Sequence, residues 1–415
     1  MSGVRRSSAT TAWHVYRWGF GFSLHVATAT FTLWLIDGVG AGALALALTG
    51  TVLEVCYTLA EVPTGVVADR YGRKLSVIVG LVVVAGGMFL TAVPALAVVL
   101  GAQVLIGAGW TFMSGADVAW LTDEVGEDAA RPLYASGMRS ELWGSVAGIA
   151  VGAGLGQLGL WVPLVASAVA LLVLAGWLGS RMHESDRQVA DDDRLTVTET
   201  LRRTRTSVRA RPAVGVLLAV MVAAGLAGEG VDRLWQLHLV GDEAGEGSTI
   251  LVVSALVLGG LLLGTALTSL VERRLAADDD GVHARRWLAA GNGLIAVSVL
   301  ALAVGPWWLA AAGLLTSQAL RNACYPLVQA WANRGADPAT RATLNSLVGQ
   351  AESVGEIAGG PSLGGVAARF GTGSSLVASA AVFGIAAWLT SWRRAVPAPA
   401  PATMPAETID PTSQR

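Results

Sequence analysis

EVPTGVVADRYGRK, residues 61–74, carries a cluster of charges between two apolar segments. One apolar segment enters it from residue 41, and the other leaves it and continues to residue 93. The stretch therefore predicts a tight loop between two membrane helices, with Arg70, Arg73 and Lys74 as its cations. Short loops this basic stay on the cytoplasmic side of a membrane. The loop thus predicts the orientation of both helices and, by alternation, of the whole chain.

The composition indicates a polytopic membrane protein. Of the 415 residues 53% are hydrophobic and 14% are charged, whereas a soluble domain carries about 25% charged residues. The net charge of −2 gives no argument for a nucleic-acid partner. The two cysteines, Cys56 and Cys324, lie inside apolar segments and predict neither a disulfide framework nor a metal site. No cofactor is predicted.

Twelve segments are long and apolar enough to cross a bilayer, which takes about 20 residues each. Their approximate bounds are 13–36, 41–66, 75–93, 95–121, 133–157, 160–180, 213–239, 249–271, 286–304, 307–331, 342–367 and 373–392. Arginines fill the connections on one side of these spans and are absent from the short connections on the other. This positive-inside pattern predicts a multi-pass, all-α protein of the plasma (inner) membrane with both termini cytoplasmic.

The spans divide six and six around one long polar segment. We predict a cytoplasmic N-terminus (1–12), a six-helix bundle (13–180), a cytoplasmic linker (181–212), a second six-helix bundle (213–392) and a disordered cytoplasmic tail (393–415). The linker fits either a solvated segment or, in its second half, an amphipathic helix on the inner leaflet. The halves also repeat, because Glu141, Gly144 and Gly148 are matched 211 positions later by Glu352, Gly355 and Gly359. Duplicated halves are typical of secondary transporters.

Gly65-x-x-x-Asp69-Arg70-x-Gly72-Arg73-Lys74 resembles the loop 2–3 signature of the major facilitator superfamily (MFS). The preceding residues 61–65 resemble a prokaryotic, drug-efflux-like branch of that superfamily. The resemblance implies two pseudo-symmetric six-helix bundles, the MFS fold, and a cytoplasmic conformational gate. The gate residues would be Gly65, Asp69, Arg70, Gly72, Arg73, Lys74 and Asp123.

Within this gate, the resemblance implies that Arg73 pairs with Asp123 and that Asp69 faces the start of the eleventh span near Arg341. These contacts would hold the cytoplasmic side shut in the outward-facing state. We also expect that a neighbouring helix can approach Gly65 closely, because glycine lacks a side chain.

Two features depart from the family pattern. Gly360-Pro361-x-x-Gly364-Gly365 resembles an antiporter signature that family members usually carry in the fifth span, whereas here it lies in the eleventh. We interpret it as a helix hinge or packing seam, because proline removes a helix hydrogen bond and glycines permit close packing. Where the family has an arginine linked with proton coupling, this chain has Gln103, so coupling would use other residues or be absent.

Ionisable groups inside a membrane are costly and usually face a cavity. Spans 1, 4, 7 and 10 line the central cavity in the superfamily, and spans 2 and 11 add four acidic residues here. The candidate proton or substrate residues are His25, Glu54, Glu61, Asp117, Glu229, Asp232, Arg233, Arg321, Glu352 and Glu356. Carboxylates in such a cavity can exchange protons, but each could instead form a structural pair, as Asp232 could with its neighbour Arg233.

The sequence therefore predicts a monomeric secondary active transporter that moves a small molecule by alternating access. Proton-coupled efflux of a small hydrophobic or cationic compound, as in multidrug antiporters, is the first interpretation. Uptake of a small metabolite by a symporter or facilitator is the alternative. A membrane hydrolase is disfavoured, because the Gly-x-Ser-x-Gly string at residues 360–364 lies in a Gly-rich helix. A non-transporting sensor would need a larger soluble domain, so no enzyme or receptor activity is predicted.

Overall fold

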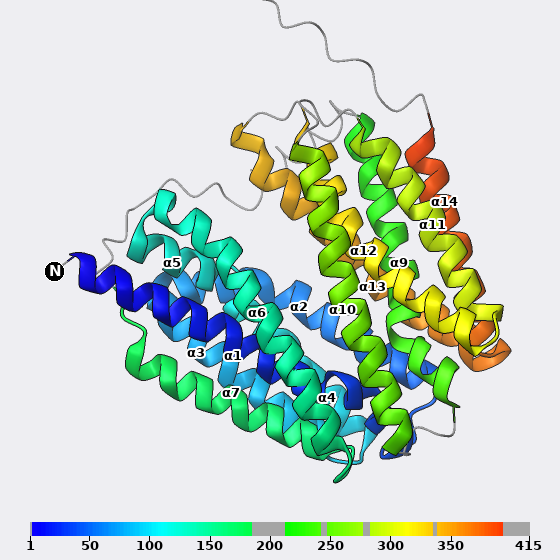
Figure 1. Ribbon diagram of the computed structural model, residues 1–415, viewed down its shortest axis with the longest axis horizontal. Coiled ribbons are helices and arrows are strands. Elements are labelled where there is room, and N and C mark those ends of the chain that lie inside the picture. Colours follow the sequence, from blue (N-terminus) through cyan, green and yellow to red (C-terminus); the bar gives the residue numbers. More distant parts are fainter. Residues whose placement is uncertain (1, 185–211, 242–246, 277–282, 335–337, 393–415) are drawn as a thin grey trace, which may run out of the picture.

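The computed structural model describes residues 2–184, 212–241, 247–276, 283–334 and 338–392, and all regular structure within these ranges is helical (Figure 1). The helices of the first half are α1 (Ser2–Asp37), α2 (Ala43–Tyr71), α3 (Arg73–Thr91), α4 (Leu96–Met113), α5 (Ala116–Val125), α6 (Glu127–Gly156) and α7 (Val162–Arg181). Those of the second half are α9 (Pro212–Val240), α10 (Gly247–Ala276), α11 (Ala284–Val304), α12 (Trp307–Asn333), α13 (Pro338–Phe370) and α14 (Thr372–Ser391).

These bounds agree closely with the predicted spans. Nine described helical segments are long and apolar enough to cross a membrane by length and composition, with α4 and α5 together counted as one segment, Leu96–Val125. Helices α6, α12 and α13 are of similar length but carry more polar residues. They pack extensively against α1, against α10 and α11, and against α2 and α9, respectively. The exact count of twelve spans stays a prediction at these three helices.

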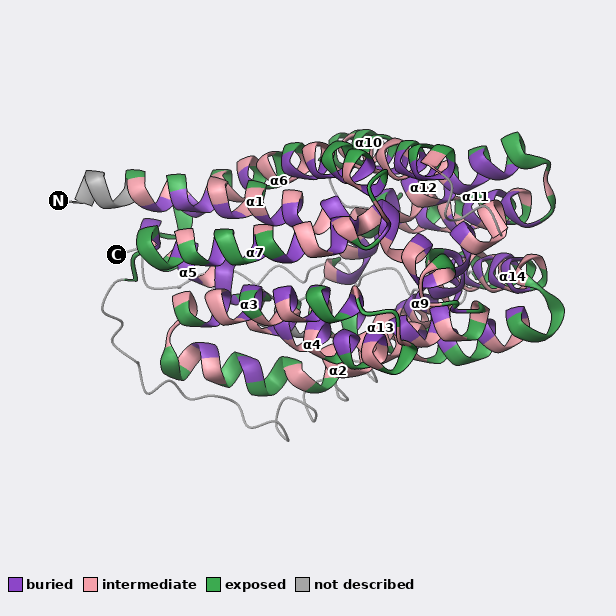
Figure 2. Cartoon of the chain, turned by 90° about the horizontal axis from the view of Figure 1, so that it is seen from below, coloured by how far each residue is buried: buried purple, intermediate pink, exposed green. Residues whose placement is uncertain are grey.

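The helices form two bundles, α1–α7 and α9–α14, with their buried faces turned toward neighbouring helices (Figure 2). One apolar core fills the first bundle, and a second core fills the other. The second core also takes in Ala29, Leu33 and Leu160 from the first half. The two bundles therefore join at the end of the molecule where α1 ends and α7 begins. We call this the Gly371 end, after the α13–α14 turn, and the opposite end the Gly72 end.

Glycines fit α1 against α6 and α9 against α13 in the same way. A Cβ atom on Gly144 would meet the backbone of Trp18, and one on Gly355 would meet the backbone of Val222. Likewise Gly21 lies against the carbonyl oxygen of Glu141, as Gly225 lies against that of Glu352. The repeat predicted from glycine spacing is thus a repeat of helix packing. It maps α6 onto α13 by 211 positions, and it maps α1 onto α9 by 204.

Gly144→Leu is expected to destabilise this packing, because the new side chain must displace the α1 backbone. Overpacking of this kind costs about 1–3 kcal/mol, and thermal unfolding of the purified protein in detergent would measure it. Gly154→Leu on the same helix is the matched control, because a Cβ there meets nothing within 4 Å. Equal melting temperatures for the two variants would contradict the role of Gly144 in the contact between α1 and α6.

Two local expectations need correction. Residues 61–74 do not form a loop, because α2 continues to Tyr71 and Gly72 alone separates it from α3. Gly72 makes the turn at φ 107°, a conformation that residues with a side chain resist. The fourth span is not continuous either, since it breaks between α4 and α5 at Gly115, where φ is 75°. The predicted linker and tail lie almost entirely outside the described residues.

Candidate transport site

A cavity of about 470 Å³ lies between the two bundles, with α2 on one side and α13 on the other. It is lined by Leu53, Glu54, Tyr57, Thr58, Glu61, Trp110, Ser346, Gly349, Gln350, Glu352, Ser353 and Glu356. The lining residues nearer the Gly72 end, Glu61, Ser346 and Gln350, are exposed, whereas Glu54 and Glu356 are half-buried. The cavity therefore runs from the middle of the molecule toward the Gly72 end.

At the Gly371 end the two halves meet closely. Gly360 of α13 lies against Thr51 of α2, and Gly364 lies against Ala47. Further around this end, the Gln157 side-chain amide donates a hydrogen bond of 3.1 Å to the carbonyl oxygen of Gly247 in the other half. The seam interpretation fits Gly360 and Gly364, whereas a Cβ atom on Gly365 meets nothing within 4 Å. The cavity is closed on this side, so the structure is open toward the Gly72 end.

Four glutamates from both halves face the cavity, Glu54 and Glu61 from α2 and Glu352 and Glu356 from α13. None of the described residues that line it is Lys or Arg. The Ser353 hydroxyl donates to Glu54 across the two halves at 3.4 Å, and Glu356 interacts electrostatically with Glu54 and Glu352. Arg233 acts electrostatically on Glu54, and Arg321 acts on Glu352 and Glu356, but both arginines are bonded to other carboxylates. The lining thus keeps an excess of negative charge. Such charge is costly away from bulk water, so the lining favours the binding of protons or of a cation.

The other predicted charges of the second half form ion pairs beside the cavity. Arg321 of α12 donates two hydrogen bonds of 2.7 Å to the Asp232 carboxylate, and Arg233 donates one of 2.9 Å to Glu229. Asp232 thus forms a structural pair, as the sequence allowed, but with Arg321 and not with its neighbour Arg233. Adjacent residues on a helix do not face each other, whereas residues four apart do, and this places Arg233 next to Glu229.

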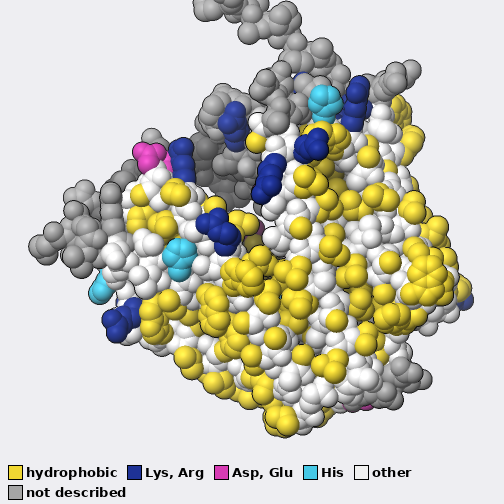
Figure 3. Space-filling view, in the orientation of Figure 1, with side chains coloured by type: hydrophobic (Ala, Val, Ile, Leu, Met, Phe, Trp, Pro, Cys, Tyr) yellow, Lys and Arg dark blue, Asp and Glu magenta, His cyan; other side chains and the backbone are white. Residues whose placement is uncertain are grey.

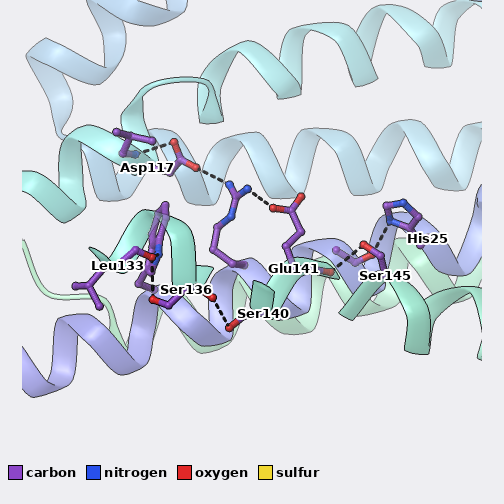
Figure 4. Close-up of polar contacts among 11 residues, drawn as sticks. His25, Asp117, Leu133, Ser136, Ser140, Glu141 and Ser145 are labelled. Atoms are coloured by element: carbon purple, nitrogen blue, oxygen red, sulfur yellow. Dashed lines mark hydrogen bonds and ion pairs between the residues drawn. The ribbon is translucent and has the colours of Figure 1, made fainter. Parts of the chain in front are cut away.

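The first half contains a charge cluster that the sequence interpretation missed in part. Arg17 of α1 forms ion pairs with Asp117 of α5, at 3.3 Å, and with Glu141 of α6. Figure 4 shows the Asp117 and Glu141 carboxylates directed toward each other, with dashed lines leading from both to the guanidinium between them. Asp117 was predicted as a site residue, but Arg17 and Glu141 were not. An arginine inside the apolar first span was the available signal.

Some of the predicted gate residues make contacts within the first half, and Gly65 faces open space. Arg73 pairs with Asp123, as the resemblance implied, and Lys74 donates a 2.9 Å hydrogen bond to the carbonyl oxygen of Gly179. Arg70 lies over the Tyr71 ring at 5.6 Å. A Cβ atom on Gly65 would meet nothing within 4 Å, so none of the described helices approaches Gly65 closely in this open state.

The Arg73–Asp123 pair does not by itself hold the Gly72 end shut. Both partners belong to the first bundle, and the pair is formed while the cavity is open at this end. It fastens α3 to α5, which keeps the Gly72 turn in place. The expected approach of Asp69 to the region of Arg341 stays a prediction.

His25, the remaining candidate, lies outside the cavity lining, as does the serine of the disfavoured hydrolase string. His25 on α1 has Nδ1 2.9 Å from the carbonyl oxygen of Gly21, within its own helix. Ser362, the serine of the Gly-x-Ser-x-Gly string, donates a 2.7 Å hydrogen bond to the carbonyl oxygen of Ala358 inside α13. A hydrolase nucleophile needs a strand–turn–helix setting instead, and this serine has none.

Comparisons with known proteins agree with this architecture. No family model matches the chain. Over 341 residues, 80% of this chain and 82% of the relative, it is 24% identical to YxaM of Bacillus subtilis (strain 168), described as an uncharacterized MFS-type transporter.

Solved transporter structures share the fold. The nucleoside transporter NupG, as its D323A mutant, matches with a TM-score of 0.79 and 11% identity over 92% of this chain and 98% of that chain. A bacterial homologue of the human lysosomal transporter Spinster, inward-facing and unoccupied, matches with a TM-score of 0.71 and 16% identity over 93% and 96%. A D-xylose–proton symporter matches with a TM-score of 0.71 and 13% identity over 94% and 98%.

The predicted fold class is therefore confirmed, because the described helices have the fold of MFS transporters. The chain is thus similar in sequence to a protein described as an MFS-type transporter, and it has the fold of solved transporters. These relatives and structural neighbours are transporters and not enzymes.

Proposed function

We propose that the protein exports a small organic cation in exchange for protons, as an MFS antiporter working by alternating access. The observation that carries this proposal is the set of four glutamates, from both halves, that faces one cavity without a basic residue in its described lining. Tyr57 and Trp110 line the same cavity. Aromatic rings attract organic cations through their faces, so the lining suits a cation with apolar or aromatic substituents.

The charges at the two ends suggest how the proposed exporter is oriented in the membrane. Most of the basic side chains visible in Figure 3 lie toward the upper end and left edge of that view, while the flanks are largely hydrophobic. Under the positive-inside rule the Gly72 end is cytoplasmic, as are both termini. The cavity then opens to the cytoplasm of the plasma membrane, which is the side from which an exporter loads.

Exchange follows from competition for the same negative charge. A bound cation and bound protons both neutralise the glutamates, so each weakens the binding of the other. Coupling further requires that cation and protons prefer different conformations, because a ligand shifts an equilibrium only by its differential affinity. Closure of the Gly72 end would bring α2 and α13 together there, and the open space at Gly65 leaves room for that approach.

A growth-inhibition panel of organic cations, in a host lacking its own efflux pumps, tests the proposal. We expect the chain to protect against lipophilic cations but not against anions of similar size. For any cation against which the protein protects, proteoliposomes that contain the protein should show proton movement opposite to the cation movement. Protection against anions alone, or movement of cation and protons in the same direction, would contradict proton-coupled cation export.

A further inference from the structure

A second, smaller pocket lies inside the second bundle, beside the cavity between the halves. Its volume is about 50 Å³, which is room for about three or four groups the size of a water molecule. Its lining comes from α9, α11, α12, α13 and α14. Glu352 of α13 lines this side pocket and the main cavity alike, so the two spaces adjoin at its side chain.

The side pocket runs from an accessible mouth to a closed, apolar interior. Tyr325 in its lining is 53% exposed, whereas Ile295 and Phe383 are each 1% exposed. Its apolar lining residues are Val220, Met221, Ala224, Leu288, Ile295, Cys324, Val328 and Phe383. Sites for small organic ligands are mostly apolar, with a few polar groups that fix the orientation of the ligand. The side pocket has this composition.

Asn292 of α11 brings an unpaired hydrogen-bond donor to the side pocket. Its residue is 3% exposed, and its Nδ2 atom has no hydrogen-bond partner among the described residues. A buried donor without an acceptor costs free energy, because it has lost its hydrogen bonds to water. A ligand oxygen that accepts from Nδ2 would remove this cost. The side pocket therefore selects for a hydrogen-bond acceptor.

The charges of the lining indicate that this acceptor is neutral. Arg321 lines the side pocket, but its charge is balanced by two 2.7 Å hydrogen bonds to Asp232. Glu352 adds a carboxylate on which Arg321 acts electrostatically. An anion would be repelled by Glu352, and a cation by Arg321. An ether or carbonyl oxygen meets neither penalty, so the positive centre of a cargo would stay with the glutamates of the main cavity.

The internal repeat shows how the second half differs here. The counterparts of Met221 and Glu352 in the first half are Arg17 and Glu141, which bond to each other as an ion pair. Methionine cannot form such a pair with Glu352. The helix pair that an ion pair joins in the first bundle therefore borders a pocket in the second.

We propose that the side pocket binds an uncharged arm of the cargo, a short apolar chain whose ether or carbonyl oxygen accepts a hydrogen bond from Asn292. This inference rests on the proposed function and narrows its substrate class to organic cations that carry such an arm. The volume limits the part of the arm inside the pocket to about three or four non-hydrogen atoms. Asn292 is then a specificity-determining residue, because the glutamates of the main cavity recognise charge alone.

Paired phosphonium probes test this assignment on the purified full-length protein. Each triphenylphosphonium cation with a methoxyalkyl arm, from methoxyethyl to methoxybutyl, is compared with the alkyl analogue of equal atom count. At the arm length that reaches Asn292, the affinity ratio of ether to alkyl probe should fall about 2- to 12-fold in Asn292→Leu, as expected for one lost hydrogen bond. Asn345→Leu is the matched control, because Asn345 bonds to Asn333 outside both linings. A ratio that is unchanged in Asn292→Leu at every arm length would overturn the inference.

Ala224→Leu tests the same pocket without touching Asn292. The larger side chain should fill the space and weaken the binding of the probes whose arms enter it. Tetraphenylphosphonium, which has no such arm, should bind as it does to wild type. Equal loss of affinity for both kinds of probe would show a general defect of the second bundle and contradict a role of the pocket in holding the arm.

A probe without any charge separates this inference from the proposed function. In saturation-transfer NMR, 2-pentanone should receive less magnetisation from Asn292→Leu than from wild type or Asn345→Leu. Equal transfer from all three proteins would overturn the side pocket as a binding site for a neutral acceptor. Failure of wild type to bind any phosphonium would overturn cation export instead, while the 2-pentanone measurement would still decide whether the side pocket takes such a group.

Discussion

Replacing Glu54 and Glu356 together with glutamine is expected to weaken organic-cation binding and transport at least about a hundredfold. A carboxylate about 6 Å from a bound cation contributes up to about 2.8 kcal/mol at an effective dielectric constant of about 20. About 1.4 kcal/mol corresponds to a tenfold change in affinity, so loss of two carboxylates can exceed two orders of magnitude. Both glutamates are half-buried in the lining between the halves, where water screens them less than at the surface. Equilibrium binding of tetraphenylphosphonium to the purified variants measures the effect.

The same double variant predicts a change in pH dependence. In wild type, protons taken up as the pH falls neutralise the cavity glutamates, so cation affinity should fall with decreasing pH. The double variant should lose much of this dependence, because two of the four carboxylates that face the cavity are gone. Glu127→Gln is the matched control, since Glu127 pairs with Arg131 on the surface and its side chain is 76% exposed. Wild-type affinity in the double variant would exclude these carboxylates as the cation site.

The membrane spans could be predicted from the sequence because their signal is local. A long apolar segment must place its backbone in a helix to satisfy its hydrogen bonds in lipid, so length and hydropathy suffice. Residues 61–71 were interpreted as a loop because they are charged, although charged residues are compatible with a helix. Only Gly72, with its positive φ, ends α2. The composition of the stretch could not distinguish one turn residue from a whole loop.

The partners of the charges could not be predicted from the sequence, because they depend on helix rotation and on contacts between distant segments. Asp232 lies beside Arg233 in the chain but bonds to Arg321, which is 89 positions away. Arg17 lies 100 positions from Asp117 and 124 from Glu141. The repeat was visible between α6 and α13 because their glycines share a spacing. The matching shift between α1 and α9 differs by seven positions and emerged only from the packing.

Gly50→Ala is expected to keep the Gly371 end from closing and so to trap the opposite state of the transporter. A Cβ atom on Gly50 would overlap the Glu229 carboxylate and the Arg233 guanidinium across the two halves. Glu229 is only 4% exposed and cannot easily move aside. Overpacking costs about 1–3 kcal/mol, which shifts a two-state equilibrium by about 5- to 150-fold. The state seen here, which is open toward the Gly72 end, should lose population, and net transport should fall by a similar factor.

The distance between spin labels at Leu158 and Phe370 would report this shift directly. Both side chains are exposed at the Gly371 end, 75% and 65%, and they belong to different halves. With cysteines introduced at these positions after replacement of the two native ones, the distance should lengthen in Gly50→Ala. Gly42→Ala is the matched control on the same stretch, because a Cβ there meets nothing within 4 Å. An unchanged distance distribution in Gly50→Ala would mean that the Glu229 and Arg233 side chains move aside for the new methyl group. Tight contact at Gly50 would then not be required for closure of the Gly371 end.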